Sequence, residues 1–379
     1  MMIIAFSGAR IFDGTSYLPG KTVLVQGGRV VDVVADADIT SNMTLLDLKG
    51  GTLAPGFVDV QVNGGGGFLF NDTPQAGALI GMAEAHARFG TTAMLPTYIT
   101  DTPEGMSTAI AAAREAMGRA SIVGLHLEGP FLSKARKGAH DPALIRPLND
   151  ADVDMLLDSM IENLLLTVAA ENASPRLIKR LVEGGVTVSL GHSDAAFDVV
   201  MAAADAGARG VTHLFNAMSQ LQHRQPGMVG AALEHGGVWC GMIPDGHHVH
   251  PAALRIALRA KRGPGRIFIV TDAMPTAGHH GDIFYLNGRK VTRQGGVLRL
   301  DDGTLAGSDL TMDQALRFVI EHLEVPEAEA LRMASLYPAQ FVRLDHTKGR
   351  IAKGYDADFV HLDNSLHVIA TYIGGTAAS

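Results

Sequence analysis

The chain lacks the sequence features of disulfide-bonded, secreted and membrane-spanning proteins. Its 379 residues include a single cysteine, so no disulfide can form within the chain, and we expect a reducing compartment, the cytoplasm. Cys240 itself lies in an apolar run and is expected to be a small buried residue, not a nucleophile. The N-terminus lacks the pattern of a signal peptide, and no window of about 20 residues is free of charged and turn residues, so we predict no membrane span.

The chain also lacks an excess of positive charge. Lysine and arginine number 31 against 39 acidic residues, which gives a formal net charge of -8. A nucleic-acid partner is therefore not expected, because phosphate backbones are bound by basic stripes or patches. Any anionic ligand must be held by a few local cations.

Both ends of the chain are rich in β-forming residues. Lys21–Gln26 and Arg29–Val34 flank Gly27-Gly28, which is a hairpin signal, and Thr44–Leu48 continues the pattern. Near the C-terminus, strands are expected at Gly349–Ile351, Asp358–Leu362 and His367–Tyr372. We therefore predict a small β-sandwich domain built from residues 1–54 and 347–379.

The middle of the chain alternates between short apolar runs and helical patterns. The eight runs are Phe57–Val62, Thr92–Pro96, Ile122–Leu127, Leu164–Val168, Val186–Leu190, Val211–Phe215, Val238–Ile243 and Ile267–Val270. Helices are expected at Ala76–Phe89, Pro103–Met117, Asp194–Ala206 and after the capping-box sequence at 311–314. Continuous apolar strands that alternate with helices predict a parallel (β/α)8 barrel of the TIM type over residues 55–346.

Polar side chains stand at or just beyond the ends of several of these runs, where active sites of such barrels lie. Glu128, His192 and His213 form a plausible metal set, because two imidazoles and one carboxylate suit zinc and leave a position for water. Either histidine alone would more often be a structural residue, and it is the set of three that favours a metal. Asp272 follows the eighth run and is a candidate general base, with capping of a following helix as the alternative. The glycine run 64–67 has no P-loop lysine after it and predicts a tight turn.

These motifs together resemble the amidohydrolase superfamily, and within it the N-acetylglucosamine-6-phosphate deacetylase family, over nearly the whole chain. The resemblance is carried by the segments 55–64, 126–130, 191–193, 212–218, 271–273 and 348–360. It implies that Glu128, His192 and His213 ligate one divalent metal, most simply Zn²⁺, with Fe²⁺, Co²⁺ and Mn²⁺ overlapping in preference. It also implies that Asp272 is base and then acid, and that His140 polarises the acetyl carbonyl.

The resemblance extends to the substrate. Gln61 and Asn63, which are expected to contact the substrate, stand where many amidohydrolases have a His-x-His pair for a second metal, which favours a single-metal site. Arg224, His248 and the backbone of Asn216 and Ala217 are implied phosphate ligands. The segment Ala306, Gly307 and Ser308 is implied to lie against the sugar. Part of the phosphate site is expected from the second subunit of a homodimer.

The implied reaction is hydrolysis of N-acetyl-D-glucosamine 6-phosphate to D-glucosamine 6-phosphate and acetate by metal-activated water, in amino-sugar metabolism. Two alternatives stay open. One is another amide hydrolase on the same barrel, such as a D-aminoacylase or a dihydroorotase, which would be expected to keep the His-x-His pair. The other is a catalytically inactive protein that binds a sugar phosphate.

Overall fold

A computed structural model describes residues 2–378, and its larger part is a parallel barrel. Eight strands are hydrogen-bonded in the order β17-β16-β15-β14-β13-β12-β11-β8. They are β8 (Phe57–Val62), β11 (Thr91–Ile99), β12 (Leu125–Glu128), β13 (Leu164–Val168), β14 (Thr187–Leu190), β15 (Gly210–Val211), β16 (Trp239–Met242) and β17 (Ile267–Ile269). A parallel bridge between Val62 and Ala273 joins the ends of the sheet. The predicted TIM-type barrel is confirmed.

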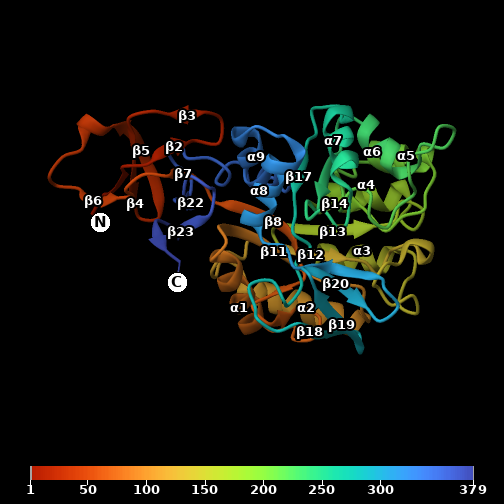
Figure 1. The fold of residues 1–379 in the computed structure, drawn as a ribbon. Coiled ribbons are helices and arrows are strands. Elements are labelled where there is room, and N and C mark those ends of the chain that lie inside the picture. The colour runs from red at the N-terminus through yellow and green to blue at the C-terminus, as the bar shows by residue number, and fades with distance from the viewer. Residues whose placement is uncertain (1, 379) are drawn as a thin grey trace.

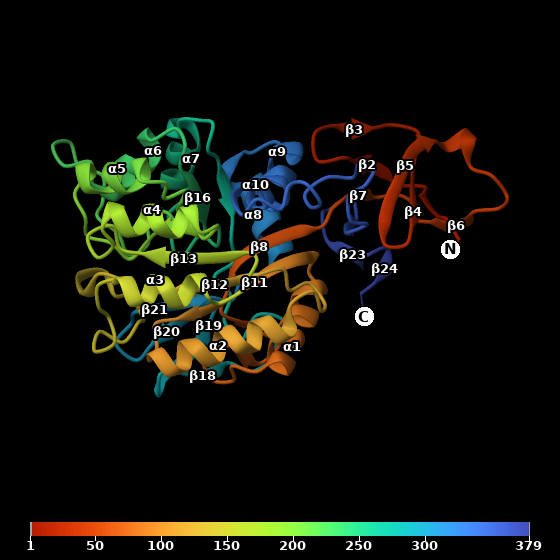
Figure 2. The same ribbon diagram turned by 180° about the vertical axis from the view of Figure 1, so that it is seen from behind.

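Helices surround the barrel (Figures 1 and 2). They are α1 (Ala76–Ala87), α2 (Pro103–Ala116), α3 (Asp150–Leu157), α4 (Pro175–Glu183), α5 (Phe197–Asp205), α6 (Gly227–Glu234), α7 (Pro251–Ala260), α8 (Met312–Leu323), α9 (Glu327–Ala334) and α10 (Leu336–Phe341). The capping box that precedes α8 is confirmed, since the Thr311 N–H donates to Gln314 Oε1 at 3.1 Å. No helix within residues 2–378 has the length and apolar character that crossing a bilayer requires.

Three predicted elements of the barrel were placed wrongly. Strand β15 contains only Gly210–Val211, because the chain turns away at His213 and Phe215, whose φ angles are +32° and +78°. Helix α5 begins at Phe197, not at Asp194, whose side chain instead binds Arg136. Ile122 makes only an isolated bridge to Met94, three residues before β12 begins.

Two further sheets join the N- and C-terminal segments into a separate small β domain, at the left of Figure 1. One has the order β5-β4-β1-β6 and the other β24-β23-β22-β7-β2-β3. Their strands are β1 (Ile4–Ser7), β2 (Arg10–Phe12), β3 (Tyr17–Leu18), β4 (Lys21–Gln26), β5 (Arg29–Ala35), β6 (Thr44–Asp47), β7 (Thr52–Pro55), β22 (Phe359–Leu362), β23 (Val368–Ile373) and β24 (Thr376–Ala377). The expected strand at Gly349–Ile351 is wrong, since these residues lie outside all strands.

Aromatic rings from both termini meet in the core of this β domain. The ring of Phe6 lies 5.4 Å from that of Phe359 and 5.0 Å from that of Tyr372, both edge to face. Such contacts are worth about 0.5–1.5 kcal/mol beyond the area they bury. The N-terminal strands therefore need the C-terminal strands to complete their core.

An antiparallel insertion after β17 reaches the mouth of the barrel. It comprises β18 (Ile283–Leu286), β19 (Arg289–Gln294), β20 (Val297–Leu300) and β21 (Leu305–Ser308). Its apolar face packs on Met274 and Ile99. Its last strand is pinned by Ser308, whose N–H donates to the Asp272 carbonyl and whose carbonyl accepts from Met274. A smaller hairpin of β9 (Gly64–Gly65) and β10 (Phe68–Leu69) confirms the predicted glycine turn.

Candidate active site

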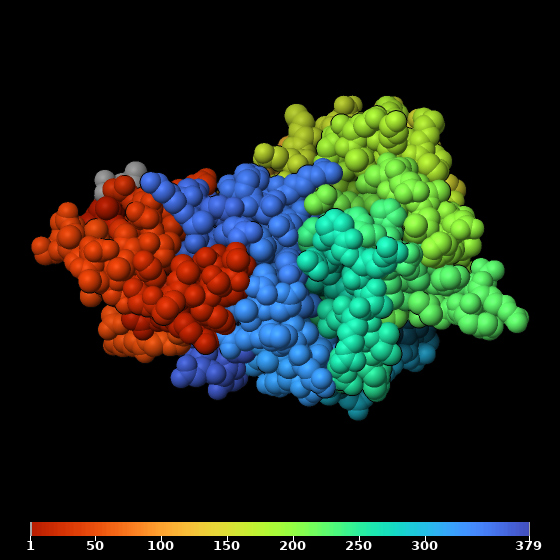
Figure 3. All heavy atoms as spheres, turned by 90° about the horizontal axis from the view of Figure 1, so that it is seen from above, coloured from red at the N-terminus to blue at the C-terminus, as the bar shows by residue number. Residues whose placement is uncertain are grey.

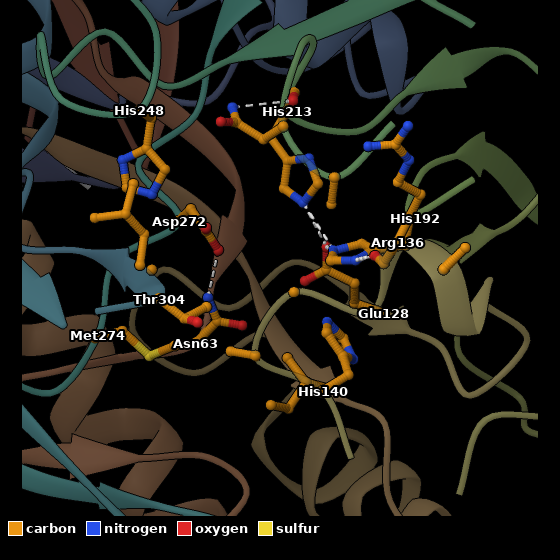
Figure 4. A pocket seen from close by; sticks show the side chains of 18 residues that line it. Asn63, Glu128, Arg136, His140, His192, His213, His248, Asp272, Met274 and Thr304 are labelled. Atoms are coloured by element: carbon orange, nitrogen blue, oxygen red, sulfur yellow. Dashed lines mark hydrogen bonds and ion pairs between the residues drawn. The ribbon is translucent and has the colours of Figure 1, made fainter. Parts of the chain in front are cut away.

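A cavity of about 400 Å³ opens at the carboxyl ends of the barrel strands (Figure 4). The predicted residues that line it are Asn63, Glu128, His140, His192, His213, Asn216, Ala217, His248, Asp272 and Gly307. Gln61, Ala306 and Ser308 are buried behind this lining. Arg224 lies outside it, on the exposed segment 221–225. Figure 3 shows the green segment that precedes α6 protruding from the surface.

Three of the lining side chains converge on one point. Glu128 Oε1 lies 3.0 Å from His213 Nε2 and 3.2 Å from His192 Nε2, and the two nitrogens are 3.0 Å apart. All three residues are buried, at 2–5% exposure. A ring nitrogen of His140 is also close, because potential ligand atoms of Glu128, His140 and His192 all lie within 4.8 Å of one another.

For His192, a hydrogen bond on the far side of the ring fixes which nitrogen faces the centre. His192 Nδ1 donates to the carbonyl of Arg136 at 2.8 Å, so the neutral ring presents the Nε2 lone pair to Glu128. A lone pair facing a carboxylate is repelled unless a cation or a proton lies between them. The donor set therefore fits a divalent metal, for which neutral imidazole and carboxylate are the usual ligands.

His140 is oriented differently. Its Nδ1 lies 2.8 Å from the hydroxyl of Thr100 and accepts from the backbone N–H of Thr100 at 3.4 Å. Because a backbone N–H can only donate, Nδ1 carries the lone pair and Nε2 carries the proton. Burial, and next the nearby His192, lower the pKa of His140 to about 3, so the ring is neutral. His140 is thus a hydrogen-bond donor whose proton is on Nε2.

Asp272 is held by the two amide side chains at the end of β8. Its Oδ1 accepts from Asn63 Nδ2 at 2.6 Å and from Gln61 Nε2 at 3.2 Å. Gln61 Nε2 also lies 3.3 Å from Glu128 Oε1, so this amide bridges the two carboxylates. Burial, and next the charge of Glu128, raise the pKa of Asp272 to about 6. A carboxyl with such a pKa can exchange a proton near neutral pH.

Backbone strain is concentrated at the same centre. His192, His213 and Asp272 have φ angles of +48°, +32° and +53°, a region that residues other than glycine rarely adopt. Strained residues persist only where the surrounding structure fixes them, and they cluster at functional sites.

Sequence reasoning missed the buried polar groups that lie beneath these residues. Asp59 in β8 accepts from Thr271 Oγ1 at 2.5 Å, and burial raises its pKa to about 7. A further chain of hydrogen bonds inside the barrel joins four strands and the residue that follows β15, with distances of 2.7–3.2 Å. It runs through Thr97, His126, Thr167, Thr212 and Ser189. The available signal was a polar residue inside several of the apolar runs, such as Asp59, His126, Thr167 and Ser189.

The rim of the cavity carries groups suited to an anion. His248 Nδ1 donates to Asp245 Oδ2 at 2.6 Å, and the same carboxylate accepts the backbone N–H of His247 and His248. Ala217 has a φ of +47°, and turns of this type expose backbone N–H groups to anions. Arg136, which the sequence analysis did not select, also lines the cavity and pairs with Asp194 at 2.7 Å.

Comparisons with known proteins agree with this fold. The amidohydrolase family profile matches residues 52–378. An N-acetylgalactosamine-6-phosphate deacetylase of a Shewanella species is 44% identical, covering 99% of this chain and 95% of that one. An N-acetylglucosamine-6-phosphate deacetylase of Haemophilus influenzae is 35% identical, covering 96% of each. The crystal structure of N-acetylglucosamine-6-phosphate deacetylase from Pasteurella multocida superposes with a TM-score of 0.95, at 36% identity and 99% coverage of both chains.

Proposed function

The chain belongs to the amidohydrolase family, and from that membership and the cavity we propose that it hydrolyses N-acetyl-D-glucosamine 6-phosphate to D-glucosamine 6-phosphate and acetate. The observation that carries the proposal is the convergence of Glu128, His192 and His213 beside Asp272 at the carboxyl ends of the strands. Relatives of 35–44% identity that span nearly the whole chain bear the names of amino-sugar phosphate deacetylases.

We assign the metal to Glu128, His192 and His213. His140 is left out of the ligand set because its proton lies on Nε2, so that nitrogen has no lone pair to offer. Zinc suits two imidazoles and a carboxylate best, although Fe²⁺, Co²⁺ and Mn²⁺ share these preferences. When bound, such an ion supplies Lewis acidity and lowers the pKa of water.

Asp272 and His140 supply the remaining chemistry. Asp272 takes a proton from the attacking water and returns it to the amine as the tetrahedral intermediate collapses. Its Oδ1 is already engaged by Asn63 and Gln61, while Oδ2 accepts no hydrogen bond from residues 2–378 and is available for this transfer. His140 donates from Nε2 to the carbonyl oxygen, where negative charge develops.

A single metal is proposed for each subunit. Gln61 and Asn63 take the positions of the His-x-His pair. The amide N–H group of Gln61 lies between Glu128 and Asp272, and that of Asn63 donates to Asp272. An amide N–H neutralises part of the carboxylate charge but offers no lone pair to a cation. A second ion would have to displace both amides.

The phosphate is proposed to bind at the rim, to His248 and to the backbone of Asn216 and Ala217, with Gly307 and its neighbours Ala306 and Ser308 against the sugar. Arg224 is exposed and lies outside the cavity of its own chain. We therefore propose that it completes the phosphate site of a second subunit in a homodimer. Because a charged sugar phosphate does not cross a bilayer unaided, the enzyme is proposed to act in the cytoplasm.

The decisive experiment is an acetate-release assay with the purified chain. N-acetylglucosamine 6-phosphate, its galactosamine epimer and the unphosphorylated sugar are compared, each with and without a chelator. We expect release from the glucosamine phosphate that chelation abolishes and added zinc restores. The epimer is included because a relative at 44% identity is named for it. Binding of the phosphates without release would favour the inactive sugar-phosphate binder, and preference for an N-acyl amino acid would favour the other amide hydrolases.

A further inference from the structure

One buried acceptor in the cavity has no donor. Asn63 is 1% exposed, and its Oδ1 accepts no hydrogen bond from residues 2–378. The loss of a hydrogen bond by a buried polar atom costs about 1–3 kcal/mol, so such atoms are rare in folded proteins. Asn63 nevertheless stands at the lining of the cavity, where a ligand can reach it.

The orientation of this amide is determined by its other end. Asn63 Nδ2 donates to Asp272 Oδ1 at 2.6 Å. Turning the amide over would place Oδ1 against the carboxylate and would lose that bond. Figure 4 shows the result, with the nitrogen of Asn63 directed at Asp272 and its oxygen directed into the cavity. The oxygen is therefore an acceptor held ready for a donor that the chain itself does not supply.

The position of Asp272 identifies that donor. In the proposed reaction Asp272 protonates the nitrogen of the scissile amide, so this nitrogen must lie within hydrogen-bond reach of its carboxylate. Asn63 is bonded to the same carboxylate. The substrate group that comes beside both residues is the acetamido nitrogen, which carries one N–H.

We propose that Asn63 Oδ1 accepts a hydrogen bond from the N–H of the scissile amide, an inference that rests on the proposed function. This contact fixes the plane of the amide, which turns its carbonyl oxygen away from Asn63. It also makes Asn63 a specificity residue, because an ester of the same shape has no proton to donate.

The test compares two substrates that differ at this one group. They are N-acetylglucosamine 6-phosphate and the 2-O-acetyl ester of glucose 6-phosphate, assayed with the wild-type chain and with Asn63→Ala. We expect Asn63→Ala to lower kcat/KM for the amide about tenfold more than for the ester, as one neutral hydrogen bond is worth. Equal losses on the two substrates would overturn the inference.

Gln61→Ala is the matched control. Gln61 also donates to Asp272, at 3.2 Å, but it does not line the cavity. Its loss should therefore change the ratio of the amide rate to the ester rate less than Asn63→Ala does, which separates the orientation of Asp272 from contact with the substrate. Asn63→Leu, which fills the vacated volume, should give the same amide-to-ester ratio as Asn63→Ala if the alanine variant folds poorly. A wild-type chain that releases acetate from neither substrate would refute the proposed function and not this contact alone.

Discussion

The floor of the cavity and its rim differ in how their residues are held. The floor comprises Glu128, His140, His192, His213 and Asp272, and the rim comprises the loops that carry Ala217 and His248. Every ionisable group of the floor is buried and tied to a neighbouring strand end, as Glu128 is to His192 and His213. The rim instead uses loops, and Arg224, which we propose completes the rim of a second subunit, stands on a segment that is exposed throughout. The buried contacts of the floor hold its side chains in one arrangement, whereas the rim is proposed to bind the phosphate of the substrate. We expect the floor to govern turnover and the rim to govern binding.

Asp272→Asn should cause the largest loss of catalytic activity. The variant keeps the shape of the side chain and can still bond Asn63, but it can neither take nor return a proton. General acid–base catalysis is worth about 10²–10⁴-fold, so kcat should fall by that factor while KM changes little. Steady-state acetate release measures both. A variant that retained near-normal turnover would remove Asp272 from the proposed role.

His140→Ala should cost about 10²–10³-fold in kcat, as the loss of one donor to a developing oxyanion does. Metal content distinguishes a donor from a ligand. We expect the variant to bind as much zinc as the wild type, whereas His192→Ala should bind less, because His192 presents a lone pair to the centre and His140 presents a proton. If His140→Ala were the variant that lost zinc, His140 would be a metal ligand and its assignment as a hydrogen-bond donor would be wrong.

Arg224→Ala should have a smaller effect, confined to binding. KM for the phosphorylated sugar should rise about tenfold or more, as for a lost charge-assisted hydrogen bond, with no change for the unphosphorylated sugar. Mixing this variant with Asp272→Asn tests whether the rim is shared between subunits. If Arg224 acts across an interface, each mixed dimer regains one site with an intact Asp272 and an intact arginine from its partner. If mixing restored no activity, Arg224 would act on the site of its own chain or on no site at all.

The sequence predicted the residues of the floor because polar side chains interrupt or directly follow the apolar runs there. Glu128, His192 and His213 were found by position alone, since parallel strands must end at one face of a barrel. The left-handed backbone at His213, which shortens β15, depends on contacts across the barrel and leaves no local signal. Asp59 was overlooked because a carboxylate inside a buried strand contradicts the pattern used to find the strand.

The insertion over the mouth could have been predicted. Asn287-Gly288 and Gly295-Gly296 are hairpin turns with positive φ, and both dipeptides are standard signals of such turns. The rim is a different case. The surroundings of Arg224 in the proposed dimer depend on a second copy of the chain, which no pattern within one copy encodes.

The smallest expected effect concerns the free energy of unfolding, and it tests how much the burial of Asp59 destabilises the folded chain. Burial raises the pKa of Asp59 to about 7, above its value of about 3.9 in an unfolded chain. The folded chain then binds the proton more tightly, so this group contributes stability that is complete below about pH 4 and is lost as the pH rises through about 7. Asp59→Asn removes the effect and keeps an acceptor for the backbone N–H groups of Gln61 and Thr271.

Thermal unfolding in chelator, where only the chain's own charges act, should therefore show Asp59→Asn gaining stability relative to the wild type between pH 4 and 7. A gain of about 1 kcal/mol or more is expected, since each unit of pKa shift corresponds to about 1.4 kcal/mol. Asp363→Asn is the control of opposite sign, because backbone N–H groups of His367 and Ser365 hold the pKa of exposed Asp363 below its usual value. That variant should lose stability relative to the wild type as the pH rises. If the stability of the wild type and of Asp59→Asn changed with pH in parallel, burial of the Asp59 carboxylate would not destabilise the folded barrel.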